Sequence, residues 1–504
     1  MLAAINSAAV HGIEAYDVTV EVDCAFGLPQ WFIVGLPAGS VKESRERVGA
    51  ALANSGFRIP PRRVTVNLAP ADTRKDGTAF DLPIALGILA ATGQIPPERV
   101  RDLVVVGELG LDGSVRAVRG ALPVARRVAV SGGRTLVLPT QNVAEASLVS
   151  AVPLAAPSSL AELVEWLLGG EALPPASEQC RPRAQGNALD LADVAGQESA
   201  KRAMEIAAAG AHNVLMIGPP GAGKTMLARR LPGILPELEE EEALEVTAIQ
   251  SVAGLLSNAS ALISERPFRA PHHTISDAGL IGGGNPPRPG EVSLAHNGVL
   301  FLDELLEFRR HVVEALRQPM EDGSVVIARA AGSVAFPARF ALVGAMNPCP
   351  CGQAGDPARR CSCAASEISR YRSRLSGPMA DRIDLHVHVG RISVSALGAR
   401  GDSRESSASV RERVQRARAK QRVRYARTPR VSCNAHAPAR LDGEWMQIGS
   451  EAVRLLADAA ERLGFTARAY HRVLRVARTI ADLDGDAAVG EPHVAEALGY
   501  RPVL

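Results

Sequence analysis

The chain has 504 residues, of which 46% are hydrophobic and 22% are charged, and its 56 basic and 54 acidic residues leave a formal net charge of +2. This length exceeds what one hydrophobic core supports, so two to four soluble domains are expected. The near balance of charge excludes a uniformly basic DNA-binding chain, and any such surface must come from local clustering. No apolar run is long enough to span a membrane, and the first residues lack the basic segment of a signal peptide, so we expect a cytoplasmic protein without membrane contact.

Residues 1–168 have the pattern of one α/β domain. Alternating apolar and polar residues predict strands at 16–22 and 63–68, and an apolar run predicts another strand at 103–107. Helical spacing is found between these strands, at 41–55 and at 82–92.

Residues 169–190 are rich in proline and glycine without sustained periodicity, which predicts a linker. Residues 191–392 then have the pattern of a nucleotide-binding α/β core, because apolar runs such as 299–302 and 340–345 suit the buried strands of a parallel sheet. Residues 393–504 have a helical pattern rich in arginine and alanine, which predicts a helical lid.

One segment of the core fits the phosphate-binding pattern G-x-x-x-x-G-K-[ST]: Gly218, Pro219, Pro220, Gly221, Ala222, Gly223, Lys224 and Thr225. A strand pattern precedes this phosphate loop and a helix start follows it. Backbone N–H groups can therefore converge on a triphosphate, with Lys224 on the β- and γ-phosphates and Thr225 on Mg²⁺. The alternative is a glycine-rich turn with an incidental lysine. Because the chain has only five lysines, the functional interpretation is favoured.

Polar residues end two of the apolar strands of this core. Asp303 and Glu304 follow residues 298–302, and Asn347 follows residues 340–346. In a site of this kind the first carboxylate holds Mg²⁺ and the second polarises the attacking water, so we assign these roles to Asp303 and Glu304. Asn347 can orient that water. A carboxylate pair that merely caps the next helix is the alternative.

Three more specific motifs give the chain its resemblance to a known family. They occupy residues 266–276 (RPFRAPHHTIS), 346–352 (MNPCPCG) and 376–385 (SGPMADRIDL). With them the chain resembles, over nearly its whole length, the ComM (YifB-like) family of magnesium-chelatase-like AAA+ ATPases. The resemblance implies an AAA+ core with a helical lid, and a ring, expected to be a hexamer, with each ATP between two subunits. It also implies that Arg382 is the arginine finger that reaches the neighbour's ATP and that Arg468 is the sensor-2 arginine of the lid.

Two insertions in the core look suited to gripping a ligand. Residues 268–284 combine His272 and His273 with the triple glycine 282–284, which favours a mobile loop, and residues 324–336 predict a hairpin with Arg329 beside its turn. In the helicase-like AAA+ rings that this chain resembles, such a hairpin projects into the central pore. The resemblance thus implies that His272, His273 and Arg329 contact DNA, Arg329 through phosphate. A structural histidine pair or adventitious metal ligands are the alternatives.

A basic stretch in the predicted lid has two equally favoured interpretations: it binds the DNA backbone, or it is a solvated helix whose charges form salt bridges. It contains Tyr425 together with Arg411, Arg413, Arg416, Arg418, Lys420, Arg422, Arg424 and Arg427.

Four of the seven cysteines crowd into fifteen residues: Cys349, Cys351, Cys361 and Cys363. This is unlike the disulfide framework of a secreted protein, and four thiolates are what tetrahedral zinc requires. A structural Zn²⁺ site and four free buried thiols are both compatible with the spacing.

The first domain resembles the proteolytic domain of Lon, through residues 75–83 and 107–114. Lon chemistry needs a serine four residues after the lysine that matches Lys75, and a second lysine downstream. Here Ala79 occupies the serine position, Thr78 is the only neighbouring hydroxyl, and no lysine occurs between residues 107 and 134. We therefore expect a non-proteolytic α/β domain retained for assembly or partner binding.

The function that these observations predict is an ATP-driven ring motor on single-stranded or branched DNA, using ATP and Mg²⁺. By resemblance it is a hexameric branch-migration helicase that aids integration of DNA in natural transformation. A magnesium-chelatase-type motor, a Lon-like ATP-dependent protease and a nucleotide-dependent scaffold are the alternatives.

Overall fold

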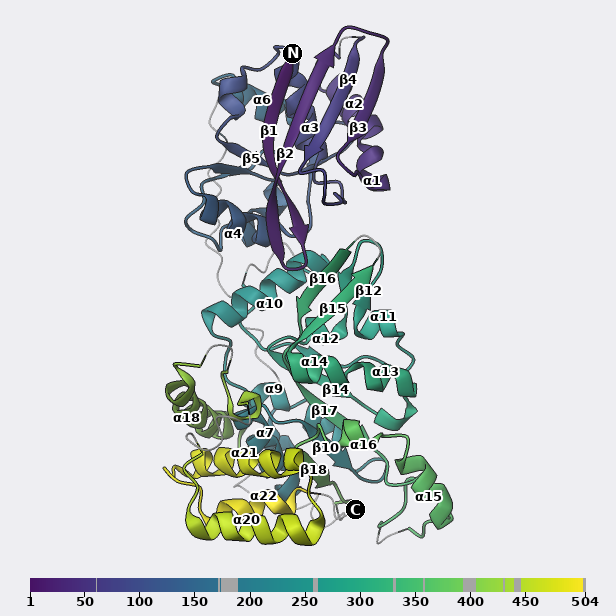
Figure 1. Cartoon of the computed structure of the whole chain (residues 1–504), viewed down its shortest axis with the longest axis vertical. Coiled ribbons are helices and arrows are strands. Elements are labelled where there is room, and N and C mark those ends of the chain that lie inside the picture. Colours follow the sequence, from purple (N-terminus) through teal and green to yellow (C-terminus); the bar gives the residue numbers. More distant parts are fainter. Residues whose placement is uncertain are drawn as a thin grey trace.

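The computed structural model describes residues 1–59, 61–170, 173, 189–256, 262–329, 332–356, 359–392, 405–428, 431–438 and 446–501. It places an N-terminal α/β domain at one end, an α/β core in the middle and a helical region at the other end (Figure 1). The expected α/β class is confirmed. Most of the predicted linker lies outside the described residues, and so does the turn of the predicted hairpin. No described helix is both long and apolar enough to cross a membrane.

The N-terminal domain is built on a seven-stranded sheet of order β3-β4-β2-β1-β5-β8-β9. The strands are β1 (Leu2–His11), β2 (Glu14–Ala25), β3 (Gln30–Val34), β4 (Arg63–Ala69), β5 (Leu103–Val105), β8 (Thr135–Val137) and β9 (Leu154–Ala155). β2 pairs antiparallel with β1 and β4, whereas the outer pairs are parallel. The strands predicted at 16–22, 63–68 and 103–107 are thus confirmed.

Helices and a short ribbon complete this domain: α1 (Gly39–Lys42), α2 (Ser44–Asn54), α3 (Asp81–Ala91), α4 (Ala121–Ser131), α5 (Val143–Ala146), α6 (Leu160–Leu167), β6 (Glu108–Leu109) and β7 (Val115–Arg116). Every residue of α3 is buried, because this helix is apolar on all faces and packs against β1 and β2. The helix predicted at 41–55 is split into α1 and α2 at Glu43.

The core is a five-stranded parallel sheet of order β11-β14-β17-β10-β18. The strands are β10 (Val214–Ile217), β11 (Phe268–Arg269), β14 (Gly298–Leu302), β17 (Phe340–Met346) and β18 (Leu385–His388). All of β14 and nearly all of β17 is buried, as expected for strands covered on both faces. Ile217 is aligned with Met346, so the carboxyl ends of β10 and β17 meet at one edge of the sheet.

The helices of the core are α7 (Glu198–Gly210), α8 (Lys224–Ala228), α9 (Leu231–Ile234), α10 (Glu240–Ala253), α11 (Asp277–Leu280), α12 (Glu291–Leu294), α13 (Arg310–Ala315), α14 (Arg317–Asp322), α15 (Ala365–Arg372) and α16 (Gly377–Ala380). Two antiparallel ribbons extend from it. One joins β12 (Gly282–Gly283) to β13 (Arg288–Pro289), and the other joins β15 (Ser324–Arg329) to β16 (Gly332–Pro337). The strands of the predicted hairpin are therefore confirmed.

The C-terminal helices are α18 (Ser407–Tyr425), α20 (Ser450–Leu463), α21 (Ala467–Asp484) and α22 (Glu491–Gly499). Val414, Ile480 and Val494 of these helices share one hydrophobic core with Val214 and Ala207 of the α/β core. The lid is thus packed on the nucleotide-binding sheet through α7.

The N-terminal domain contacts the core through the turn between β1 and β2, which points at β16 (Figure 1). Gly12 has a φ of +66°, and a Cβ placed on it would lie 2.7 Å from the carbonyl oxygen of Ala335. Ile13 packs against the same hydrophobic cluster as Phe336. A second contact joins α4 to α10, beside which the Gly120 N–H donates to the Ser251 carbonyl oxygen at 3.3 Å.

Candidate functional site

The phosphate loop connects β10 to α8, as its sequence predicts. Gly221 and Gly223 have φ values of +76° and +95°, a conformation that L side chains rarely adopt. A Cβ on Gly218 would lie 2.1 Å from the carbonyl oxygen of Val389. The loop therefore needs glycine at these positions for two different reasons, backbone conformation and the close approach of the backbone that follows β18.

Lys224 is at the centre of this loop and is 8% exposed. Its Nζ donates to the carbonyl oxygens of Gly218 (2.6 Å) and Pro219 (3.0 Å) and to Oδ1 of Asn347 (3.3 Å). Burial lowers the pKa of Lys224, and the nearby carboxylates of Asp303 and Glu304 oppose that shift. The structure thus brings Lys224 and Asn347 together.

The two carboxylates differ in their surroundings. Oδ2 of Asp303 accepts a hydrogen bond from the Thr225 hydroxyl at 2.7 Å, and its Oδ1 accepts from the Glu304 N–H at 3.0 Å. The hydroxyl and the carboxylate form a pair of oxygen donors, which are the ligands that Mg²⁺ prefers. Glu304 is exposed and has a φ of +52°, which is unusual for a residue other than glycine and is commonest at functional sites.

The histidine pair lies next to Glu304. Nδ1 of His273 is 3.8 Å from a carboxylate oxygen of Glu304, and the rings of His272 and His273 are 4.1 Å apart. The loop predicted to contact DNA therefore reaches the carboxylate predicted to polarise water. A DNA contact by either histidine stays a prediction.

Arg382 and Arg468 lie beside each other and share one acidic partner. Arg382 is 4% exposed and pairs with Glu321 through Nη2, while its Nη1 donates to the Pro378 carbonyl oxygen at 2.6 Å. Arg468 is exposed and lies 3.7 Å from Glu321. The small pocket that both line is bordered by Glu321, Asp381, His471, Arg472 and Arg475, none of which belongs to the phosphate loop.

A buried acidic residue holds the segment that carries Arg382. Asp384 accepts hydrogen bonds from Arg472 Nη1 (2.5 Å) and from the Asn213 N–H (3.0 Å). Burial alone would raise the pKa of Asp384, but Arg472 and His212 outweigh it and keep the pKa below its ordinary value. The Asn213 side chain also donates to the Arg382 carbonyl oxygen at 2.9 Å, so the candidate arginine finger is anchored to β10.

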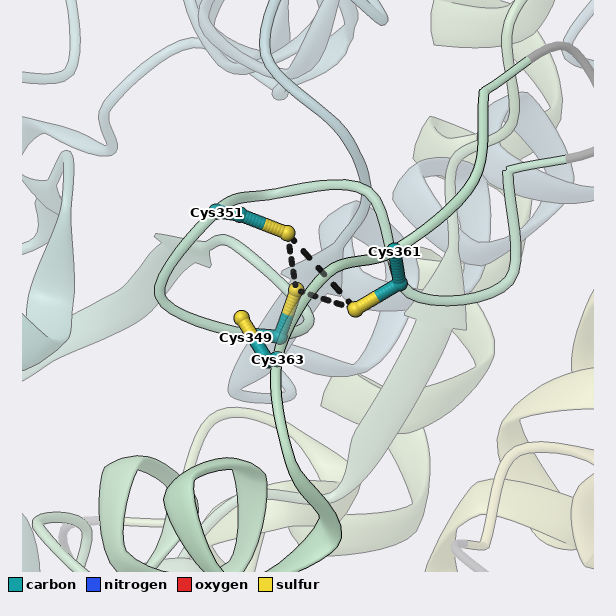
Figure 2. A group of neighbouring side chains, drawn as sticks. All are labelled: Cys349, Cys351, Cys361 and Cys363. Carbon is teal, nitrogen blue, oxygen red and sulfur yellow. Dashed lines mark hydrogen bonds between the residues drawn. The ribbon is translucent and has the colours of Figure 1, made fainter.

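The structure brings the four cysteines together (Figure 2). The Sγ atoms of Cys349, Cys351 and Cys361 are 3.4 to 3.7 Å apart, and all four sulfurs lie within 4.8 Å of one another. Four sulfurs around one zinc at ~2.3 Å would be roughly 3.8 Å apart, so the donor set and its spacing fit the metal. Backbone N–H groups of Ser362 and Gln353 lower the pKa of Cys351 to about 6, whereas at Cys361 and Cys363 burial and the neighbouring sulfurs outweigh the backbone hydrogen bonds and raise the pKa.

The two predicted insertions lie side by side. A Cβ on Gly282 would be 2.9 Å from Cδ1 of Ile327, and one on Gly283 would be 3.5 Å from Nη2 of Arg329. Arg329 itself is exposed at the end of β15. The β12–β13 and β15–β16 ribbons therefore form one joint surface with Arg329 on it.

The basic stretch does not expose all of its charge, because several of its arginines bond to neighbouring elements. Arg418 donates to the carbonyl oxygen of Ala208 near the end of α7, and Arg424 pairs with the buried Asp482 at 2.6 Å. Arg411 and Arg413 also bond to the core, through the Gly233 carbonyl oxygen and Glu205. The residues that remain exposed are Arg416, Lys420, Arg422 and Arg427.

The residues that sequence reasoning missed are Glu321, Asn213 and Asp384. Asp384 stands in the quoted SGPMADRIDL motif, which was a usable signal. Glu321 and Asn213 carry no local signal, because their roles depend on partners 61 and 169 residues away.

The chain matches three family descriptions in succession. "Subunit ChlI of Mg-chelatase" matches residues 20–142, "Magnesium chelatase, subunit ChlI" matches 190–397, and "Magnesium chelatase, subunit ChlI C-terminal" matches 404–501. Together they cover the N-terminal domain, the α/β core and the lid.

Full-length relatives are known. The "Competence protein ComM" of Haemophilus influenzae is 46% identical over 100% of this chain and 98% of its own length, and YifB of Salmonella typhimurium is 42% identical over 100% and 97%. The magnesium-chelatase 38 kDa subunit of Rhodobacter capsulatus is 29% identical over 31% of this chain and 49% of its own. Membership of this group implies an ATPase that uses ATP and Mg²⁺. The chain belongs to the ComM and YifB family of magnesium-chelatase-like AAA+ proteins.

Proposed function

We propose that this protein is an ATP-driven ring motor on DNA, a hexameric branch-migration helicase that acts in recombination, including the integration of DNA in natural transformation. The observation that carries the proposal is the joint surface of the β12–β13 and β15–β16 ribbons, which presents Arg329 and leads through His273 to Glu304. A DNA strand on this surface would thereby be linked to the ATP site. The name of the Haemophilus relative, a competence protein, supports the same function.

The residues of the ATP site divide the work of hydrolysis. Lys224 would leave the loop carbonyls for the β- and γ-phosphates, and Thr225 and Asp303 would hold Mg²⁺, which neutralises phosphate charge. Glu304 would polarise the attacking water and Asn347 would orient it. The segment 218–225 would form the cradle around the phosphates.

The arginine finger Arg382 would come from the neighbouring subunit, and Arg468 would be the sensor-2 arginine of the lid. Arg382 lies with Glu321 and Arg468 in a pocket that no residue of the phosphate loop lines, which supports a role for Arg382 at an ATP other than the one that Lys224 would bind. Planar guanidinium groups stabilise the charge that spreads over the transferred phosphoryl group. A ring of subunits would place each Arg382 at the next subunit's ATP.

A branched-DNA assay tests the function directly. The purified full-length protein is given ATP, Mg²⁺ and a labelled three- or four-way junction, and both hydrolysis and strand exchange are followed. We expect DNA to stimulate hydrolysis and ATP to drive exchange. Glu304→Gln is the matched control, because it should bind ATP and DNA but neither hydrolyse ATP nor exchange strands. Hydrolysis unaffected by any DNA, with no strand exchange, would rule the proposal out.

A second candidate is a magnesium-chelatase-type motor, which the partial match to the Rhodobacter subunit favours. Binding of a partner chelatase subunit without DNA stimulation would support that function. Strand exchange in an otherwise normal Glu304→Gln protein would instead indicate a scaffold that needs no turnover.

We further propose that Cys349, Cys351, Cys361 and Cys363 hold one structural Zn²⁺ ion. Elemental analysis of protein purified without a metal-binding tag or chelator should find one zinc per chain. A content well below that would contradict the site.

A further inference from the structure

The cysteine cluster touches the phosphate loop. Gly352 lies between the first two cysteines and the rest of the cluster, and a Cβ placed on it would be 2.6 Å from Cδ of Pro220 and 2.9 Å from its Cγ. The φ of Gly352 is +77°, and its N–H donates to the Cys349 carbonyl oxygen at 2.9 Å. The turn that follows the first cysteine is therefore packed directly on the loop that would cradle the phosphates, with no room for a side chain between them.

The same segment carries Asn347, whose Oδ1 accepts a hydrogen bond from Lys224 at 3.3 Å. Cys349 follows Asn347 by two residues and is fully buried. Nε of Arg372 donates to the Pro348 carbonyl oxygen at 3.3 Å, which attaches the peptide between them to α15. The position of the Asn347 amide thus depends on how the cysteine segment is held.

The far side of the segment is attached to the other flank of the phosphate loop. The buried carboxylate of Asp356 pairs with Arg391 at 2.7 Å. Next to Arg391 the Gly390 carbonyl oxygen accepts from Gln197, whose Nε2 also reaches the Ala222 carbonyl oxygen at 3.2 Å. The cysteine segment therefore contacts the phosphate loop directly at Pro220 and indirectly near Ala222.

Nothing regular in the described backbone holds this segment in shape. Between the end of β17 at Met346 and the start of α15 at Ala365, its described residues 347–356 and 359–364 form neither helix nor strand. Four thiolate bonds to one metal ion can supply the rigidity that such a loop lacks, because metal-binding free energy acts as folding free energy.

We infer that the zinc held by the four cysteines is a strut for the ATP site: it fixes the Gly352 turn against Pro220 and Asn347 against Lys224, so nucleotide affinity and turnover depend on zinc. This inference rests on the proposed ATPase function. It assigns the metal a task in nucleotide binding, in addition to local stability.

Two variants separate the metal from the contact that it supports. Cys361→Ser removes a ligand that lies 14 residues from Asn347, and we expect it to lose zinc, unfold at a lower temperature and bind a fluorescent ATP analogue at least about tenfold more weakly. Gly352→Ala keeps all four ligands, but its Cβ collides with Pro220. It should retain one zinc per chain and still lose affinity. Cys24→Ser, a buried thiol in β2 of the other domain, is the matched control and should change neither zinc content nor nucleotide affinity.

The measurements are zinc per chain, thermal unfolding, affinity for the ATP analogue and steady-state hydrolysis, all on the full-length protein. A Cys361→Ser protein that loses zinc but keeps wild-type nucleotide affinity and turnover would overturn the inference. So would a Gly352→Ala protein with unchanged affinity. Failure of the proposed function has a different signature, since wild-type hydrolysis would then be unaffected by DNA, while the zinc content and the nucleotide affinities of the variants still test the role of the metal.

Discussion

The N-terminal domain and the α/β core each bury a lysine beside a threonine and acidic residues. Lys75 is fully buried and donates to the Thr73 carbonyl oxygen at 2.8 Å, and Lys224 is 8% exposed and donates to two loop carbonyls. Burial lowers the pKa of both lysines. By residue type and by electrostatics alone the two places are difficult to tell apart.

Their partners distinguish them. In the N-terminal domain Thr78 donates to Glu108, and Asp81 is held by Ser44 and by Arg47 at 2.7 Å, so these polar groups satisfy one another within the domain. In the core the polar groups come from the carboxyl ends of three adjacent parallel strands and converge on one edge of the sheet. A buried lysine with a shifted pKa is therefore weak support for catalysis, and convergence of groups from several strands is stronger.

The largest expected effect tests this difference between the lysines. Lys224→Ala should abolish ATP hydrolysis and weaken nucleotide binding, because no other cation of the loop replaces it. Lys75→Met is the matched variant, and it should lower the unfolding temperature while leaving hydrolysis per folded chain unchanged. Steady-state ATPase assays and thermal unfolding of both proteins check the pair. A Lys75→Met protein that is folded but inactive would show that Lys75 takes part in ATP hydrolysis.

The next effect tests whether a neighbouring subunit is needed. The polar groups around Lys75 in the N-terminal domain find their partners within one chain, whereas the ATP site is proposed to require an arginine from a neighbour. Arg382→Ala should lower turnover by about 10³-fold, the lower range for arginine fingers, with nucleotide affinity largely intact. Mixing Arg382→Ala with Lys224→Ala protein should restore part of the activity, because some interfaces then combine an intact loop with an intact finger. Full activity of an isolated wild-type monomer would contradict a shared site.

A third effect compares a buried ion pair of the core with an exposed one of the N-terminal domain. Asp384→Asn should lower the free energy of unfolding by about 3 kcal/mol at pH 7, because it leaves the partly buried Arg472 guanidinium without its buried carboxylate partner. The pKa of Asp384 is below its ordinary 3.8 in the folded chain, so its stabilisation is present above about pH 4 and is lost as the pH falls further. Denaturant unfolding at pH 7 and pH 3 should show the stability difference between variant and wild type beginning to narrow at the lower pH, because the unfolded chain then takes up a proton on Asp384 before the folded chain does.

The exposed pair of Asp17 with Arg127, at 2.7 Å, provides the control. Asp17→Asn should cost at most about 1 kcal/mol, because solvent screens exposed charges. If Asp17→Asn lowered the free energy of unfolding as much as Asp384→Asn does, burial would not determine how strongly these ion pairs stabilise the fold.

The smallest expected effect is none. Ala79→Ser restores the hydroxyl that the Lon-like motif lacks, but Lys75 is already bonded to Thr73 and no second lysine follows between residues 107 and 134. We expect no cleavage of a labelled unfolded substrate, with Lys224→Ala protein as the blank. Cleavage by the Ala79→Ser protein would show that the N-terminal site is one substitution away from catalysis.

The strands and the phosphate loop could be predicted from sequence because their signals are local. Apolar runs mark β14 and β17, and parallel pairing then brings Asp303 and Asn347 to the loop. The pairing of Arg382 with Glu321 could not be predicted, since 61 residues separate them and Glu321 is one of many surface acids. The arginines of α18 that bond to the core could not be identified from sequence. Charge patterning does not show that a carbonyl near the end of α7 accepts a hydrogen bond from a distant side chain such as Arg418.

The contact between Gly12 and Ala335 has a mechanical consequence. The turn of the N-terminal domain lies against β16, which pairs with the strand that carries Arg329, and the contact leaves no room for a side chain at position 12. A displacement of that ribbon during the ATP cycle must therefore push the N-terminal domain or break the contact. If that ribbon moves as the proposed motor function requires, a protein bound to the N-terminal domain would resist the movement without contacting the ribbon itself.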